Sequence, residues 1–162
     1  MLGTNPGGSV VEIAREEPPM FDTILVPVDE NTLSLRAVTT AGRLAEALSS
    51  RLLLLHVAVA PPDYATAAAV ELAPAVLRSA AEEYGNKVLE GFRARVPAGV
   101  GADTVLRHAR KNVWEEIVDA AEHDVDLIVM GTHGREGVAR ALLGSVAERV
   151  AHHAEVPVML VR

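Results

Sequence analysis

Five short runs of apolar residues follow one another from residue 20 onward, and each has the length of a β-strand. The runs cover residues 23–28, 52–59, 102–107, 125–130 and 156–161, of which the third, ADTVLR, is the weaker strand signal. Uninterrupted apolar runs of this length are typical of parallel strands in a sheet that is covered on both faces. Pro157 cannot donate a hydrogen bond to a neighbouring strand, so we expect it at the start of a strand or on an edge strand.

The segments between these runs have the spacing of helices. Helices are predicted over residues 32–49, 77–96, 112–123 and 145–153. In the first of them the predicted apolar stripe consists of Leu35, Val38, Leu44, Ala45 and Leu48. Strand and helix alternate to the end of the chain, which predicts an α/β fold with a doubly wound, five-stranded parallel sheet and helices on both faces.

Residues 1–19 differ in composition from the rest of the chain and are predicted to form a flexible tail. Three glycines and a proline open this segment, and Pro18-Pro19 close it in an extended form. Met20 follows directly and is a candidate alternative start. Residues 20–162 are then expected to form one domain, which is long enough to bury a core.

Composition and charge narrow the range of functions. The net charge is −7, so the surface would repel a nucleic acid. Aromatic residues make up 3% of the chain, which leaves few side chains that could stack on bases. The absence of cysteine excludes disulfides and thiolate sites. No apolar run approaches the roughly 20 residues that span a bilayer, and the first residues do not resemble a secretory signal. We therefore expect a cytoplasmic protein without membrane or nucleic-acid partners.

The candidate chemistry lies in the loop after the fourth predicted strand. Gly131, Gly134, Gly144 and Ser145 have the spacing Gly-x2-Gly-x9-Gly-Ser, and Arg135 adds positive charge to an acidic chain. Glycines let the backbone approach a ligand closely, and the unpaired amides at the start of a helix favour an anion. In parallel sheets ligands bind outside the carboxyl ends of the strands. This loop is therefore a candidate phosphate site.

Two local interpretations of the same loop stay open. Glycines after a strand are common in any α/β turn. Ser145 and Glu148 also fit a capping box, in which Ser145 caps the last helix and Glu148 reaches back to it. A serine that caps a helix can still offer its amide and hydroxyl to a phosphate, so this interpretation and a phosphate site are compatible.

With these motifs the chain from residue 20 to 162 resembles the nucleotide-binding branch of the universal stress protein family. The segments that carry the resemblance read MFDTILVPVD, LLLLHV, DLIVMGTHGREG, LLGSVAERV and VPVMLVR. The resemblance implies strand order 3-2-1-4-5 and a bound ATP, with Mg²⁺ held mainly by phosphate oxygens and water. It also implies a homodimer through the last strand.

The resemblance further implies which residues bind the nucleotide. An acidic residue at the end of the first strand, Asp29, contacts the adenosine part, while apolar residues enclose the base. The complete predicted binding set is Pro27, Val28, Asp29, Val57, Met130, Gly131, His133, Gly134, Arg135, Gly144, Ser145 and Val146.

The chain departs from the family pattern at two turns. Glu30-Asn31 replaces a small pair after Asp29, and a carboxylate that pointed inward there would repel a polyphosphate. The turn after the third strand carries Arg110-Lys111 in place of a Gly-x-Pro turn. These basic residues either attract nucleotide or form a solvated loop.

Other chemistries lack their motifs. There is no P-loop, no dinucleotide-binding glycine turn, no nucleophile elbow and no pair of histidines with metal-ligand spacing. His56 lies within an apolar run and is predicted to be a hydrogen-bonded core residue. The leading hypothesis is an ATP-binding stress-response protein whose nucleotide biases conformation or association. The alternatives are an interaction module that does not bind nucleotide and a slow ATP hydrolase.

Overall fold

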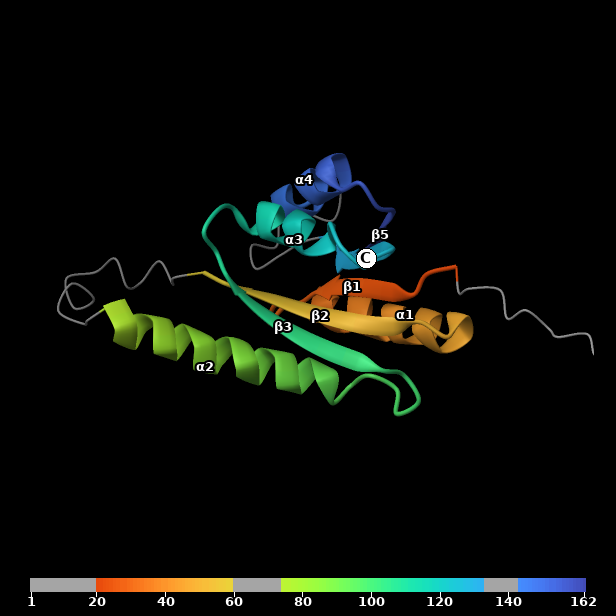
Figure 1. Cartoon of the computed structure of the whole chain (residues 1–162), viewed down its shortest axis with the longest axis horizontal. Helices are drawn as coiled ribbons and strands as arrows, with labels where there is room; N and C mark the ends of the chain where they lie inside the picture. The colour runs from red at the N-terminus through yellow and green to blue at the C-terminus, as the bar shows by residue number, and fades with distance from the viewer. Residues whose placement is uncertain (1–19, 60–73, 133–142) are drawn as a thin grey trace, which may run out of the picture.

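The computed structural model describes residues 20–59, 74–132 and 143–162, which form five strands and four helices (Figure 1). In chain order they are β1 (Thr23–Pro27), α1 (Thr32–Leu48), β2 (Arg51–Ala58), α2 (Pro74–Arg93), β3 (Ala102–His108), α3 (Val113–Ala121), β4 (Leu127–Gly131), α4 (Ser145–His153) and β5 (Val158–Val161). The predicted tail, residues 1–19, lies outside the described residues.

All five strands are parallel and lie in the order β3-β2-β1-β4-β5, which confirms the predicted fold. Ile24 of β1 is in register with Leu52 of β2 on one side and with Leu127 of β4 on the other. The chain therefore builds the sheet outward from β1 in one direction and then crosses back to β4. The winding reverses between β1 and β4, where ligands bind in folds of this kind.

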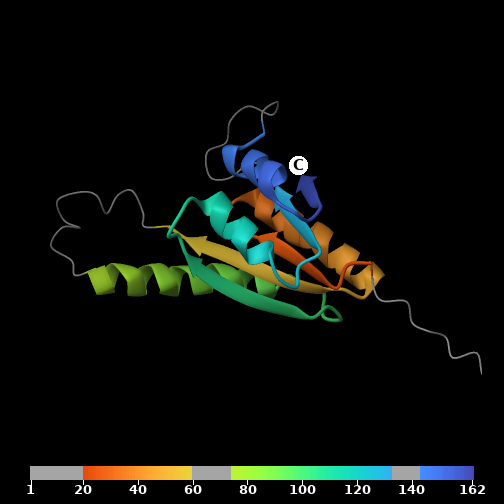
Figure 2. The same cartoon turned by 45° about the horizontal axis from the view of Figure 1, so that its top comes forward.

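Side chains on the strands alternate between two cores, one on each face of the sheet. Ile24 and Val26 point to the face that α1 and α2 cover, whereas Leu25 points to the face that α3 and α4 cover. All three side chains are completely buried. Figure 2 shows the sheet between these two layers of helices. Burial on both faces explains why the strands appear in the sequence as continuous apolar runs.

Helix α1 packs on the sheet mainly through small residues, which corrects the predicted stripe at Leu35 and confirms it at Val38 and Ala45. Leu35 is 41% exposed, and Ser34 takes the buried position beside it. The buried residues of the helix are Ser34, Ala37, Val38, Ala41, Gly42 and Ala45. Their spacing follows the helical period and leaves Leu35 outside the stripe. The short side chains allow the helix to lie close to β1 and β4.

Polar turns set the ends of two elements differently from the prediction. Strand β4 begins at Leu127, two residues later than expected, and the Asp126 carboxylate before it accepts hydrogen bonds from the amides of Asp22 and Thr23. Strand β5 begins at Val158, and the Pro157 carbonyl before it accepts a hydrogen bond from Ile128. Pro157 thus precedes an edge strand, as its missing amide predicted.

Helices α3 and α4 lie side by side and are joined by an aromatic contact. The ring of Trp114 stacks on the ring of His153, with centroids 4.7 Å apart, and the guanidinium of Arg149 lies 5.6 Å from the Trp114 centroid. Trp114 is the only tryptophan in the chain. In the part of the chain that the structure describes, no helix combines the length and hydrophobicity needed to cross a bilayer.

Candidate functional site

A cavity of about 120 Å³ opens at the carboxyl ends of β1, β2 and β4. Seven predicted site residues line it, namely Pro27, Val28, Asp29, Val57, Met130, Gly131 and Val146. Leu55, Val113, Ile117 and Ala147 complete its apolar wall, and Ser34 and His56 are polar residues that the sequence analysis did not place in the site. The cavity lies where the winding of the sheet reverses and combines apolar walls with a few polar groups, as small-molecule sites do.

Asp29 and Ser34 form a closed pair of hydrogen bonds at one end of the cavity. The Asp29 amide donates to Ser34 Oγ at 3.0 Å, and the Ser34 hydroxyl donates to Asp29 Oδ1 at 2.6 Å. The amide of Asn31 donates to the same oxygen at 3.1 Å. From the described residues no hydrogen bond reaches Asp29 Oδ2. One oxygen of this half-buried carboxylate is therefore held by the protein, while the other can accept from a ligand.

The Glu30-Asn31 departure is compatible with a ligand at Asp29. Asn31 is the N-cap of α1, where its side chain accepts a hydrogen bond from the Leu33 amide at 3.0 Å. Glu30 is exposed and does not line the cavity. Of the two neighbouring carboxylates, Asp29 and Glu30, only that of Asp29 therefore borders the site.

Gly131 lies at the end of β4 in close contact with the first turn of α1. A Cβ atom added at Gly131 would lie 2.8 Å from the Leu33 Cβ, which is closer than real Cβ contacts. The loop pattern predicts a sharp turn beside a ligand at this glycine. The close packing of β4 against α1 also requires a glycine at this position, and this requirement does not depend on a ligand.

Helix α4 begins at Ser145, and its N-cap is Gly144, so the predicted capping box is wrong. Gly144 has no side chain to cap the helix, and the amide of Glu148 bonds to the Gly144 carbonyl at 2.9 Å. Among the described residues, no acceptor is found for the amides of Ser145, Val146 and Ala147. Val146 and Ala147 also line the cavity. Gly144 and Ser145 are not among the lining residues, but they directly precede Val146, so the positive end of the helix dipole and amides without an acceptor in the described chain lie next to the cavity.

The remaining predicted phosphate-loop residues, His133, Gly134 and Arg135, lie outside the described residues. The chain on either side of them is joined by a hydrogen bond from the Gly144 amide to the Thr132 carbonyl at 2.7 Å. Residues 132 and 144 are thus adjacent in space.

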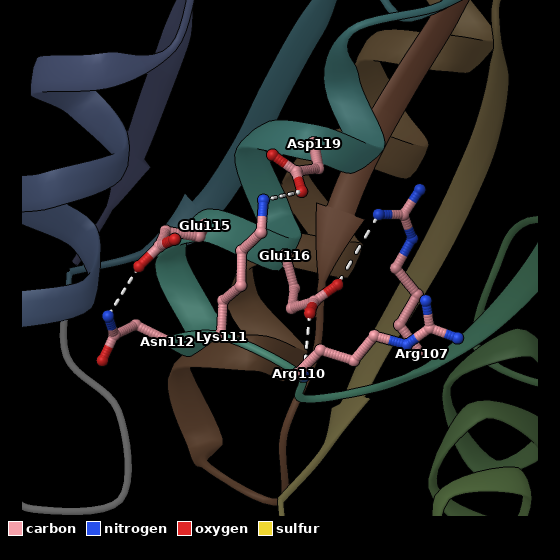
Figure 3. A network of polar contacts seen from close by, with 7 residues as sticks. All are labelled: Arg107, Arg110, Lys111, Asn112, Glu115, Glu116 and Asp119. Atoms are coloured by element: carbon pink, nitrogen blue, oxygen red, sulfur yellow. Dashed lines mark hydrogen bonds and ion pairs between the residues drawn. The ribbon is translucent and has the colours of Figure 1, made fainter.

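The turn between β3 and α3 is held by a buried carboxylate (Figure 3). Glu116 Oε1 accepts a hydrogen bond from the Arg110 amide at 2.9 Å, and its Oε2 lies 3.7 Å from Arg107 Nη1. The Glu116 side chain is only 9% exposed. Its neighbour Ile117 lines the cavity, so this network fixes the turn against the wall of the site.

The basic side chain of Lys111, two residues before α3, is paired with an acidic residue of that helix. Its ammonium forms an ion pair with Asp119 at 3.0 Å, and Figure 3 shows Lys111 lying along the helix toward Asp119. The hydrogen bond and the charge of Asp119 raise the pKa of Lys111 above its ordinary value of 10.5. Asn112 donates to Glu115 at 2.6 Å. Of the two open interpretations of this basic turn, the Lys111 contact favours a surface loop.

His56 is a core histidine, as predicted. It is 6% exposed, and its Nδ1 lies 2.8 Å from the Val28 carbonyl oxygen, which can only accept. The described residues contain no group of three or more His, Asp or Glu side chains suited to a metal ion. A magnesium ion at this site would therefore be held mainly by phosphate oxygens and water, because the cavity wall offers a single carboxylate, that of Asp29.

A larger hollow of about 770 Å³ lies at the opposite edge of the sheet. It is lined by the amino ends of the strands, including Thr23 and Arg51, and by acidic side chains such as Asp126. Ligands of doubly wound sheets bind at the carboxyl edge, and Asp126 already accepts two backbone hydrogen bonds. The smaller apolar cavity is therefore the candidate site.

Comparison with known proteins agrees with this geometry. The sequence model of the Universal stress protein family matches residues 20–162. The chain belongs to the universal stress protein family. A universal stress protein of Methanocaldococcus jannaschii is 32% identical over 93% of this chain and 87% of its own length.

Solved structures of universal stress proteins show the same fold. A family member from Burkholderia pseudomallei is 32% identical, covers 87% of this chain and 96% of its own, and has a TM-score of 0.68. A universal stress protein solved in complex with cAMP is 28% identical, covers 88% of this chain and 98% of its own, and has a TM-score of 0.62.

Proposed function

We propose that this universal stress protein binds ATP, with Mg²⁺ on the phosphates, in the cavity at the carboxyl ends of β1, β2 and β4. One observation carries the proposal: the same cavity is bordered by a carboxylate oxygen and by the start of α4, and neither that oxygen nor the first amides of α4 have a partner among the described residues. A nucleotide combines hydrogen-bond donors at one end with negative charge at the other. The complex of a related universal stress protein with cAMP supports an adenine nucleotide as the ligand class.

Each part of the site suits one part of the nucleotide. Val28, Val57 and Met130 offer apolar surface to the base, and Asp29 accepts from a sugar hydroxyl or an exocyclic amine. The amides of Ser145 and Val146 bind phosphate oxygens at the start of α4. The predicted residues His133, Gly134 and Arg135 complete the phosphate end of this proposal.

Equilibrium titration of the purified chain with Mg·ATP tests the proposal. We expect saturable binding to one site per chain, which Asp29→Ala weakens by about tenfold because a charged hydrogen bond is lost. Thr39→Ala is a matched control, since it removes an α1 hydroxyl whose one bond within the described residues is to the Leu35 carbonyl. An absence of saturable binding to wild type would exclude the function and leave the interaction-module alternative.

We further propose that nucleotide occupancy biases association into a homodimer through β5. Strand β5 lies at the edge of the sheet, and Met159 in it is 37% exposed. An edge strand with exposed apolar residues can pair with a second copy, whereas a charged residue there opposes pairing. Sedimentation velocity should show a dimer for wild type and a monomer for Met159→Lys. A wild-type monomer with and without ATP would contradict this interface.

A further inference from the structure

We propose that Ser34 is a positioning residue for the ligand: it fixes the Asp29 carboxylate so that Oδ2 alone faces the nucleoside. The inference rests on the proposed nucleotide binding and deepens it, because it also sets the direction in which the nucleotide lies. Ser34 is 6% exposed and lines the cavity.

The hydrogen bonds around Asp29 leave the carboxylate one arrangement. Ser34 Oγ accepts from the Asp29 amide at 3.0 Å, so its own hydrogen is directed to Asp29 Oδ1 at 2.6 Å. The Asn31 amide reaches Oδ1 as well, at 3.1 Å. With two donors on Oδ1, rotation of the carboxylate would break both bonds. Preorganisation of this kind reduces the entropy that a bound ligand must remove from the site.

Ser34 is itself held in place by the first turn of α1. Its amide bonds to the Asn31 carbonyl at 3.0 Å, and the preceding residue, Leu33, packs against Gly131 at the end of β4. The backbone that carries the Ser34 hydroxyl is therefore held in place, and the two hydrogen bonds to Asp29 orient the hydroxyl itself. This arrangement distinguishes Ser34 from the exposed hydroxyl of Thr39 on the same helix.

The fixed carboxylate determines which end of a nucleotide lies at Asp29. An ionised carboxylate only accepts hydrogen bonds, so its free oxygen requires a donor and repels phosphate. The open amides of Ser145 and Val146 only donate, so they require an acceptor such as a phosphate oxygen. The nucleoside must then lie toward β1 and the phosphates toward α4. Ser34 contributes to the first of these contacts and has no part in the second.

A double-mutant cycle with two ligands tests this role. Calorimetric affinities for Mg·ATP are measured for wild type, Ser34→Ala, Asp29→Ala and the double variant, with Thr39→Ala as the control. Ser34→Ala should weaken ATP binding about tenfold in wild type and less than about twofold in the Asp29→Ala background. Inorganic tripolyphosphate serves as the second ligand, and its affinity should be the same for wild type and Ser34→Ala. Thermal unfolding of each variant verifies that the fold is retained.

The possible outcomes separate the two levels of the proposal. Equal losses from Ser34→Ala in both backgrounds, or an equal loss for tripolyphosphate, would show a general structural role and overturn the positioning role. ATP binding by wild type that is unaffected by Ser34→Ala would also overturn it, while leaving the proposed function intact. If wild type binds neither ligand, the proposed function fails and the role of Ser34 falls with it.

Discussion

The amide nitrogen of Gly144 lies 2.7 Å from the carbonyl oxygen of Thr132, so the start of α4 is joined to the end of β4. The Thr132 amide in turn donates to Val161 at the end of β5. These bonds fix the first turn of α4 relative to Met130 and Gly131, which line the cavity. The open amides of α4 therefore have a defined position before any ligand arrives.

Ser145→Pro should remove one of these amides without disturbing the helix. Proline is favoured at the first position of a helix, and Gly144 before it has φ −64° and ψ 145°, a conformation that proline permits in its predecessor. We expect about a fivefold to tenfold loss of ATP affinity relative to Ser145→Ala, which removes only the hydroxyl. Equal affinities of the two variants, measured by calorimetry, would mean that this amide does not bind phosphate.

Gly131→Ala should destabilise the protein whether or not nucleotide is present. The new Cβ would lie 2.8 Å from the Leu33 Cβ, which is attached directly to the backbone of α1 and cannot rotate away. We expect a loss of about 1–3 kcal/mol in the free energy of unfolding, measured by urea denaturation. Gly99→Ala is the matched control, because no atom beyond its two neighbours in the chain lies within 4 Å of its added Cβ. Equal stability of the two variants would contradict the packing role.

The fold could be predicted from the sequence because its main determinant is local. Every strand except β3, which reads ADTVLRH, is dominated by apolar residues, and the alternation with helices leaves few possible topologies. The burial of Ser34 could not be predicted in the same way, since a serine beside Leu35 gives no apolar signal. Only the hydrogen bonds to Asp29 explain why a polar side chain occupies that buried position.

The N-cap of α4 shows a second limit of local patterns. Ser145 and Glu148 have the spacing of a capping box, yet Ser145 is the first residue of the helix and the N-cap is Gly144 before it. The bond from the Gly144 amide to Thr132, a residue twelve positions away, sets this start. A contact of that kind depends on how β4 and α4 meet in space, which the local sequence does not encode.

Glu116→Ala should be the most destabilising acidic substitution in α3. It removes the acceptor of the Arg110 amide and the partner of Arg107 from a nearly buried position (Figure 3). We expect a loss of about 1–2 kcal/mol in the free energy of unfolding, and a smaller loss for Glu116→Gln, which keeps an acceptor oxygen. Glu115→Ala breaks only an exposed bond to Asn112 and should change stability by less than about 0.5 kcal/mol. Equal losses at both positions would refute the role of Glu116.

The stabilisation that the charge of Lys111 gives through its pair with Asp119 should be lost at the alkaline end of the pH range. Because the folded-state pKa of Lys111 is raised above 10.5, the stabilisation is fully present below pH 10.5 and is lost as the pH rises through the raised value. Asp119→Asn should lower that pKa, as followed by NMR of the lysine side chain. Lys111 is 53% exposed, so the midpoint of thermal unfolding at pH 7 should fall by at most about 2 °C. An unchanged pKa in the variant would contradict the pairing.

The stacking of Trp114 on His153 gives the protein its own optical reporter. The only indole of the chain belongs to α3 and stacks on a residue of α4, and its neighbour Val113 lines the cavity. Its emission depends on the groups that lie against the ring, so a small shift between the two helices changes the signal. The intrinsic fluorescence of this domain can therefore follow events at the carboxyl edge of the sheet in real time, without a dye attached anywhere on the chain.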